Sequence, residues 1–516
     1  GKDYSGNGNN WTPNNFSVTA GAGNDSLVDS PTSYGTDTGV GGTVRGNYAT
    51  FNPLDVSGTG TILDGNLQLN GSSGAWYQSR CGFGLTSGKW YWEVYIVATN
   101  EAINGICIGI ANSSVQTAGY NTANQWSYNN NNGGRKGLNT VSTAYGTAFI
   151  TADTVGVAFD ADAGSITFYV NNSSQGVAAS SGLPNPAFPT VSAYGTDKVA
   201  INFGQRPFAY TAPSGFKALC TQNLPTPTIG ATATTTADKY FAPVLYTGTG
   251  SNLPVTVGFQ PDWIWTKARS AVDNNVEVDV LRGIGNILIT NSTAAESSYG
   301  AFVSFDANGF TKAAAESVSG RTYVAWNWKA NGSGSTNTAG SITSSVSANT
   351  TSGFSIVTYN GTGANATVGH GLGVAPSMII IKSRSSAGTN WNSYHVSLGA
   401  SACIVLNLTI AAASGTSFFN GTAPTSTVFS LGTDGSTNPS GAQQVAYCFA
   451  EVAGYSKFGS YTGNGSSDGP FVYCGFRPAF VMLKRVDATG EDWFIYDATR
   501  NPSNATNLRL EPNLSD

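Results

Sequence analysis

Charged side chains are scarce in this 516-residue sequence. Asp, Glu, Lys and Arg make up 10% of it, whereas soluble domains average about 25%. The 24 basic residues form no cluster, so we expect no nucleic-acid binding through the phosphates. No apolar run reaches the roughly 18 residues of a membrane-spanning helix. We therefore expect neither nucleic acid nor the membrane interior as a partner.

Residues that bind metals or act as nucleophiles are also few. The sequence has 2 His and 6 Cys, and no cysteines have the CxxC spacing of a zinc site. We favour buried free thiols, although spacing leaves a disulfide open. Neither His370 nor His395 accompanies a Gly-x-Ser-x-Gly nucleophile motif. We predict no catalytic residues, no metal site and no cofactor.

Two acidic features need separate interpretation. The run DADAG at 160–164 matches the start of a calcium loop but lacks the bidentate Glu of such loops, so we interpret it as a tight turn. Glycan cleavage requires two carboxylates about 5–10 Å apart, and spacing alone selects no such pair. Glu93 lies on an aromatic strand and is the acid that we most expect to be buried, with a structural role.

What the sequence does contain is typical of β-structure. Apolar runs are short, β-branched or aromatic, and Gly, Asn, Ser or Pro interrupts them every 8–12 residues or so. Aromatic residues make up 11% of the chain, enough to bury a large apolar area. The length exceeds the roughly 250–300 residues of a single core. We predict an all-β chain of several antiparallel β-sandwiches.

Four motifs in the first half resemble the SPRY family. They are SGKWYWEV at 87–94, DTVGVAFD with ITFYVN at 153–171, FPTV at 188–191 and INFGQRPF at 201–208. Their order is that of the family, over about 140 residues. The resemblance implies a β-sandwich of two antiparallel sheets whose loops at one end bind partners, and a recognition module instead of an enzyme.

The second half contains an internal repeat of about a hundred residues. Tyr-x-Gly-x-Gly begins at Tyr246, Tyr359 and Tyr461, and each copy leads to a Pro and then an apolar strand that ends in Lys six residues later. We expect the motif to form a turn with positive φ and the Lys to end its strand at solvent. Only 56 residues remain from Tyr461, so we expect an incomplete third copy and a chain that is a segment of a longer one.

Composition and repeats together predict six segments. They are an extended Gly/Asn-rich connector at 1–60, the SPRY-like sandwich at 61–220, a Thr/Pro linker at 221–238, and β-repeats at 239–350, 351–453 and 454–516, the last incomplete.

An Asn-rich run at 125–135 is the best candidate for a binding site. It combines two aromatic residues with amides and an Arg. Flat rings can stack on a ligand, and amide and guanidinium groups can bind hydroxyls or carboxylates. We name Trp126, Tyr128, Asn130 and Arg135 as candidate ligand-binding residues. The alternative is an exposed loop without a ligand.

The chain as a whole resembles large virion proteins of tailed bacteriophages. The opening DYSGNGNNWTPNNFS at 3–17, the SPRY-like module and the Tyr-x-Gly-x-Gly repeats carry this resemblance. It implies a non-enzymatic tail-fibre or adhesin subunit in the virion, expected to be a homotrimer, that contacts a host surface glycan or protein. A capsid or tail decoration protein that binds other virion proteins, and a polysaccharide-degrading tailspike, are the alternatives.

Overall fold

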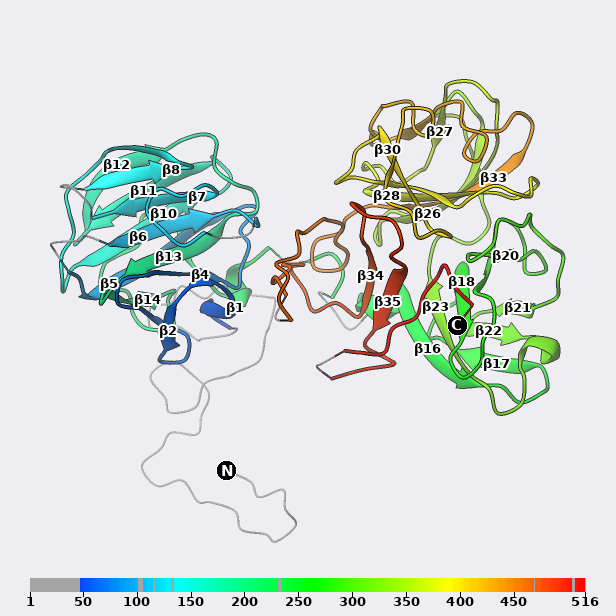
Figure 1. The fold of residues 1–516 in the computed structure, drawn as a ribbon, viewed down its shortest axis with the longest axis horizontal. Coiled ribbons are helices and arrows are strands. Elements are labelled where there is room, and N and C mark those ends of the chain that lie inside the picture. Colours follow the sequence, from blue (N-terminus) through cyan, green and yellow to red (C-terminus); the bar gives the residue numbers. More distant parts are fainter. Residues whose placement is uncertain are drawn as a thin grey trace, which may run out of the picture. The chain divides into compact units, whose positions relative to one another are not determined.

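The computed structural model divides the chain into two compact units. Unit 1 comprises residues 1–226 and 461–475, and unit 2 comprises 227–460 and 476–516. The structure describes residues 47–100, 105–114, 117–130, 134–225, 227–230, 234–467, 469–503 and 506–515. The opening motif at 3–17 lies outside them. Within these residues the regular elements are strands and three short 3-10 helices, so the all-β prediction is confirmed (Figure 1).

The described part of unit 1 contains two sheets. The seven-stranded sheet has the order β1 (Phe51–Gly58), β4 (Trp76–Cys81), β13 (Phe188–Tyr194), β6 (Ile106–Ala111), β7 (Gln125–Asn129), β8 (Arg135–Leu138), β9 (Val141–Ala144). The eight-stranded sheet has the order β12 (Ser173–Ala179), β11 (Ser165–Val170), β10 (Thr154–Asp160), β5 (Lys89–Ala98), β14 (Lys198–Asn202), β3 (Gln68–Gly71), β2 (Gly60–Leu63), with β15 (Lys217–Ala218) beside β5.

Alternating side chains of these strands build the core of unit 1. Trp92 on β5, Val157 on β10 and Ile108 on β6 are fully buried in one apolar cluster, as the period of two in a strand requires. β5, β10 and β11 lie where the SPRY-like motifs place them. The predicted sandwich is therefore confirmed.

The start of this unit differs from the predicted boundary. Residues 1–60 are predicted as a connector, yet β1 pairs with β4 and Phe51 is fully buried in the core. Pairing with β4 buries the Phe51 side chain, although the residues around it in the sequence are mostly polar. Residues 1–46 lie outside the described part. At the other end, the boundary between the units, after residue 226, falls inside the predicted linker, which also holds η2 (Thr221–Asn223) and η3 (Ala237–Lys239).

Unit 2 contains two larger sheets and three small ones. The first larger sheet has the order β16 (Phe241–Thr247), β23 (Thr322–Trp328), β18 (Trp263–Ala268), β19 (Val276–Asp279), β20 (Leu288–Ile289). The second has the order β24 (Ser335–Asn337), β25 (Ser344–Asn349), β26 (Phe354–Asn360), β33 (Gln443–Phe449), β28 (Met378–Ser383), β29 (Asn392–His395), β30 (Ala402–Val405), β31 (Ala413–Ser414). The small sheets are β17 (Leu253–Thr256), β22 (Gly309–Lys312), β21 (Phe302–Asp306); β27 (Ala366–Gly369), β32 (Val428–Leu431); and β34 (Phe480–Lys484), β35 (Trp493–Asp497). η4 (Ala314–Glu316) precedes β23.

The sequence repeat has a counterpart in this strand order. β16-β23-β18-β19-β20 in the first repeat matches β26-β33-β28-β29-β30 in the second, and the hairpin β34–β35 of the third matches β18–β19. We keep the names repeat 1, repeat 2 and repeat 3 for 239–350, 351–453 and 454–516. Part of repeat 3, residues 461–475, is counted with unit 1.

The repeats of unit 2 share a core. Trp263 on β18, Tyr447 on β33 and Ile495 on β35 belong to one buried cluster, although they come from three different repeats. Neighbouring positions on the same strands face elsewhere: Ile264 lies in a core of repeat 1 alone, and Cys448 lies in a core that combines repeat 2 with Ile342 and Val346, which the predicted boundary at 350 assigns to repeat 1. Each larger sheet thus has one face in the core that the three repeats share and one face in a core of its own. Apart from residues 461–475, the structure places the predicted β-domains in one compact unit instead of separate ones.

Candidate functional site

The candidate ligand-binding residues occupy a strand and its surroundings, not an exposed loop. Trp126 and Tyr128 lie on β7 with 9% and 0% of their surface exposed, and both belong to the core of unit 1. The Tyr128 hydroxyl donates to the carbonyl of Thr147. The predicted loop is therefore corrected: cross-strand pairing with β6 turns both rings into the sandwich, and neither offers a free face for stacking.

The other two candidates are engaged in local contacts. Asn130 is fully buried; its Oδ1 accepts from the Ile106 N–H at 3.3 Å and its Nδ2 donates to Thr99 Oγ1 at 3.2 Å. Arg135 begins β8, and its Nε donates to Ser142 Oγ on β9 at 2.9 Å. Trp126 and Tyr128 meet in the core, but the set does not converge on a common surface.

The acidic turn at 160–164 is built by protein donors. Asp160 Oδ1 accepts from the Ala163 N–H at 2.9 Å and Oδ2 lies 3.1 Å from Lys89 Nζ. Asp162 Oδ1 accepts from the Gly88 N–H at 2.8 Å. Although burial favours the neutral form, the Ala163 N–H and the Lys89 ammonium hold the pKa of Asp160 below its ordinary value. These contacts support the tight-turn interpretation.

Glu93 is buried, as expected, and is held by three donors. Its carboxylate accepts from the N–H groups of Ala209 at 2.8 Å and Tyr210 at 2.9 Å, and from the Tyr91 hydroxyl at 3.2 Å. Burial raises the pKa of Glu93, while these hydrogen bonds oppose that rise. Glu93 thereby ties the segment after β14 to β5.

The two histidines lie apart and each has local partners. His370 is fully buried; its Nε2 lies 3.1 Å from the Thr425 carbonyl and its Nδ1 accepts from the Leu372 N–H at 3.2 Å. His395 Nδ1 accepts from the Ser397 N–H at 3.2 Å. Burial lowers the pKa of both imidazoles. Among the cysteines, Cys81, Cys107, Cys403 and Cys448 are buried free thiols.

In the first two copies of the Tyr-x-Gly-x-Gly motif, both glycines are needed, for different reasons. The second has positive φ, +76° at Gly250 and +71° at Gly363, a conformation that favours glycine. At the first, a Cβ would lie 2.2 Å from a carbonyl oxygen, that of Val318 for Gly248 and of Pro439 for Gly361. The predicted positive-φ turn therefore describes half of the motif, and close backbone packing describes the other half.

The lysine near the end of the apolar strand is directed inward in repeats 1 and 2. Lys267 and Lys382 are 1% and 0% exposed. Lys267 Nζ donates to the Asp273 carbonyl at 2.7 Å, and Lys382 Nζ to the Thr389 carbonyl at 3.0 Å. The prediction that this Lys ends its strand at solvent is wrong for these two, because the loop after the strand folds over the ammonium and supplies the acceptors.

The residue at one equivalent position after that loop, which is Asn275, Trp391 or Trp493, joins its repeat to another, and the three contacts form a closed cycle. Trp391 Nε1 of repeat 2 donates to the Ile289 carbonyl of repeat 1 at 3.1 Å. Trp493 Nε1 of repeat 3 donates to the Val405 carbonyl of repeat 2 at 3.0 Å. Asn275 Nδ2 of repeat 1 donates to the Leu514 carbonyl of repeat 3 at 2.7 Å. Each repeat thus binds the backbone of another, and the three contacts close on themselves.

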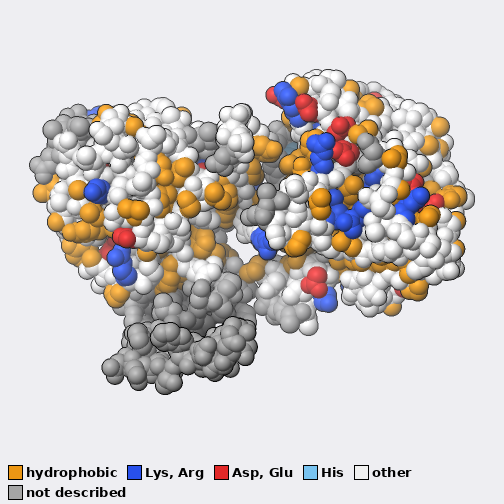
Figure 2. Space-filling view, turned by 60° about the horizontal axis from the view of Figure 1, so that its bottom comes forward, with side chains coloured by type: hydrophobic (Ala, Val, Ile, Leu, Met, Phe, Trp, Pro, Cys, Tyr) orange, Lys and Arg blue, Asp and Glu red, His pale blue; other side chains and the backbone are white. Residues whose placement is uncertain are grey.

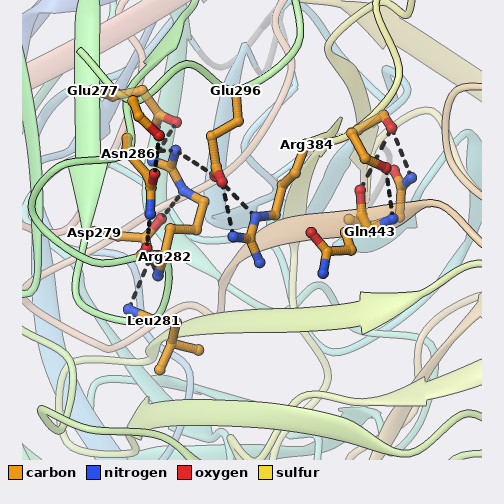
Figure 3. Close-up of polar contacts among 12 residues, drawn as sticks. Glu277, Asp279, Leu281, Arg282, Asn286, Glu296, Arg384 and Gln443 are labelled. Atoms are coloured by element: carbon orange, nitrogen blue, oxygen red, sulfur yellow. Dashed lines mark hydrogen bonds and ion pairs between the residues drawn. The ribbon is translucent and has the colours of Figure 1, made fainter.

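The most highly charged cluster of unit 2 lies between repeats 1 and 2 (Figure 3). Arg282, which follows β19, contacts Glu277 Oε1 at 3.0 Å and Asp279 Oδ2 at 2.5 Å, with all three side chains 0% exposed. Tyr447 on β33 donates to Asp279 Oδ2 at 2.7 Å. The Trp263 indole N–H donates to Glu277. Buried charges require such partners, so this cluster fixes repeat 2 against repeat 1.

A second ion pair extends the cluster toward solvent. Glu296 lies 3.3 Å from Arg282 Nη1 and accepts two hydrogen bonds from Arg384, each 2.9 Å long. Burial raises the pKa of Glu277 to about 7; Arg282 opposes that rise and Asp279 adds to it. With Glu277 protonated, Arg282 and Arg384 balance Asp279 and Glu296 in charge. The arrangement buries these charged groups inside the fold, and none of Glu277, Asp279 or Arg282 is exposed to a substrate.

The same Asp-x-x-Arg pattern recurs in repeat 3. Arg500 Nε donates to Asp497 Oδ2 at 2.6 Å, and the Trp326 indole N–H of repeat 1 donates to the same carboxylate at 3.1 Å. Our sequence analysis missed both Asp-Arg pairs, although their i, i+3 spacing at 279–282 and 497–500 was readable. What the spacing does not show is that each pair meets a residue of another repeat.

Two family models match this chain. One, described as a domain of unknown function (DUF7483), matches residues 236–516, more than half of the chain. The chain belongs to this DUF7483 family. The other, the SPRY domain, matches residues 89–206, so the SPRY part of the sequence-based identification is confirmed. The repeats and the charged cluster lie within the DUF7483 region.

Solved structures similar to the chain include SPRY domains. The SPRY domain of human HERC1 is 24% identical, with 30% of this chain and 96% of that chain covered and a TM-score of 0.27. A human SPRY domain is 18% identical, with 30% and 99% covered and a TM-score of 0.26. Stonustoxin is 17% identical, with 30% and 27% covered and a TM-score of 0.24.

Proposed function

We propose that this chain is a non-enzymatic structural protein of a tailed-bacteriophage virion, namely a tail-fibre or adhesin subunit that contacts a glycan or protein on the host surface. The observation that carries the proposal is that the buried charged side chains make contacts that stabilise the fold. Glu277, Asp279 and Arg282 are enclosed in one network, and Glu93 accepts from backbone N–H groups. Such groups stabilise a rigid scaffold and are withheld from substrates.

The surface supports the same proposal. On the face drawn in Figure 2, charged side chains are few and scattered among uncharged ones. Because such a surface makes few electrostatic interactions, the stability of the protein should depend little on ionic strength. This property suits a particle that persists outside the cell. Repeated β-units in several copies would add avidity to weak single contacts, and we propose a homotrimer.

Immunogold labelling of virions with antibodies against the purified chain tests the location. Label on the tail fibres is expected, whereas label on the head would favour the alternative of a capsid decoration protein and contradict the fibre. Sedimentation equilibrium of the purified chain tests the trimer, and a monomer at micromolar concentration would contradict it.

Incubation of the chain with host capsule or lipopolysaccharide tests the non-enzymatic role. No oligosaccharide should be released. Release that is abolished by boiling the chain would favour the alternative of a degrading tailspike.

A further inference from the structure

A cavity of about 460 Å³ in unit 2 lies apart from the network between the repeats. Its lining includes Lys239, Tyr240, Phe259, Gln260 and Lys329. The volume is within the range of about 300–1,000 Å³ that small-ligand sites occupy. None of these residues belongs to the repeat-joining contacts described above.

Strand pairing brings the two lysines of the cavity together. The Lys329 N–H, directly after β23, donates to the Tyr240 carbonyl, directly before β16, at 2.9 Å. Lys239 precedes Tyr240 in the chain, so both ammonium groups come from the same end of the β16–β23 pair. The register of this pair places two cationic side chains on one cavity.

The side chains that line the cavity carry positive charge only, while two carboxylates lie just outside the lining, Asp262 near Lys329 and Asp238 beside Lys239. Its described lining residues include two Lys and no Asp or Glu. Lys239 Nζ lies 3.7 Å from Asp238 Oδ2, with 43% and 66% of the two side chains exposed. An ion pair that is this exposed to water contributes little to stability. Lys239 can therefore exchange this partner for a ligand anion at a small cost in free energy.

The amide of Gln260 is oriented by a buried carboxylate. Asp262 is 3% exposed and accepts from the Ala330 N–H at 2.8 Å and the Gly332 N–H at 3.3 Å. The Gln260 side chain also lies close enough to Asp262 to favour its ionised form. Because an ionised carboxylate only accepts, a Gln260 amide turned toward Asp262 presents its NH₂ to that carboxylate and leaves its oxygen for another donor.

We propose that this cavity binds an acidic sugar residue of a host-surface glycan. The carboxylate of the sugar meets Lys239 and Lys329, a hydroxyl donates to Gln260, and the apolar ring face lies on Tyr240. Two ammonium groups select the anion, while the amide and the aromatic ring select a carbohydrate over a simple ion. The inference rests on the proposed host-binding function and assigns it a ligand class and a site.

Isothermal titration calorimetry of the full chain tests the site. The probes are an oligogalacturonate tetrasaccharide, its carboxyl-reduced neutral counterpart and inorganic phosphate, in low salt. We expect the acidic tetrasaccharide to bind at least tenfold more tightly than either other probe. Equal binding of the neutral sugar would overturn the role of the lysines, and equal binding of phosphate would overturn the sugar assignment.

Variants assign the binding to this cavity. The double variant Lys239→Ala/Lys329→Ala should weaken tetrasaccharide binding at least tenfold, and Gln260→Ala about threefold. Lys457→Ala is the matched control, because Lys457 is 41% exposed and also pairs with a neighbouring acid, Glu451. A double variant that binds like the control would overturn the proposal.

Adsorption of the labelled chain to host cells separates this inference from the proposed function. If the wild-type chain adsorbs and the double variant adsorbs equally well, the cavity is wrong while the host-binding role stands. If the wild-type chain does not adsorb at all, the host-binding role fails together with the cavity. Loss of adsorption in the double variant alone supports both.

Discussion

Unit 1 and unit 2 are both built from β-strands, but the side chains that make up their interiors differ. In unit 1, two sheets enclose one apolar cluster that includes Trp92 and Ile108, and the buried Glu93 is satisfied by nearby N–H groups. In unit 2, Trp263 and Tyr447 stack with ring centroids 4.2 Å apart at the centre of a core shared by three repeats. An ion network lies beside that stack.

The difference follows from what each sheet faces. A two-sheet sandwich needs only an apolar inner face on each sheet, because each sheet has one partner. A sheet of unit 2 has two apolar faces, and apolar contact does not distinguish one repeat from another. Directional contacts such as Tyr447 to Asp279 and Trp326 to Asp497 select which repeat meets which.

Removing the guanidinium of Arg282 should have the largest effect on this comparison. Arg282→Met leaves Glu277 and Asp279 buried without their cation, and we expect unit 2 to lose about 3–5 kcal/mol of unfolding free energy. Urea unfolding followed by pulse proteolysis measures the two units separately. Adding Glu277→Gln and Asp279→Asn should restore much of the loss. Stability of unit 2 within 1 kcal/mol or so of wild type would contradict the importance of the network.

The pH dependence should be the next largest effect. The folded-state pKa of Glu277, about 7, is above its ordinary value of 4.5, so between these two pH values the folded chain holds a proton that the unfolded chain has lost. Unit 2 should therefore become less stable as the pH rises through that range, by at most about 1.4 kcal/mol per pH unit.

Urea midpoints at pH 5, 6, 7 and 8 measure this slope. Glu277→Gln should flatten it, because the amide does not titrate. Glu93 of unit 1 contributes a dependence of the same sign, since burial raises its pKa too. A slope in unit 2 that Glu277→Gln leaves unchanged would assign the effect elsewhere.

The first glycine of the repeated motif should show a smaller effect that depends on its repeat. Gly248→Ala forces a Cβ against the Val318 carbonyl, and we expect a loss of about 1–3 kcal/mol. Gly463 has the same place in the third motif, but its Cβ would meet nothing within 4 Å. Gly463→Ala should be nearly neutral by thermal unfolding. Equal losses in the two variants would show that the contact does not decide the effect.

The smallest effect should come from an Asn that recurs in all three repeats. Asn291, Asn407 and Asn513 each accept from a backbone N–H at the start of a hairpin strand, at 2.8–2.9 Å. Replacing any one with Ala should cost about 0.5–1.5 kcal/mol, measured by urea unfolding. Similar costs would show that the repeats use this contact alike; a loss confined to one variant would break the equivalence.

Local sequence patterns were sufficient to predict the strands of the SPRY-like motifs and the internal repeat. β10 and β11 both lie within the motif at 153–171, because alternation, β-branched residues and turn-forming Asn are local properties. The turn residues Asn171 and Asn172 both have positive φ. The spacing from Tyr to Pro to Lys marked equivalent strands, since each copy uses the same hairpin.

The environment of individual side chains was beyond that pattern. Trp126 and Tyr128 are predicted to bind a ligand because they lie among amides and near an Arg in the sequence, yet pairing of β7 with β6 buries both rings. Lys267 reads as a surface charge, and only the folded loop shows its carbonyl acceptors. Burial depends on what packs against a strand, which is a non-local property.

Composition and periodicity were thus enough for an all-β chain, motif spacing for three related repeats, and the resemblance to the SPRY family for the sandwich. Only the tertiary structure decided that the repeats close on one another and share a core. The deciding contacts join residues 88, 102 and 239 positions apart, the last being Asn275 to the Leu514 carbonyl. No sequence window spans such a distance, and the acceptor is a backbone carbonyl, which every residue carries and no sequence pattern can single out.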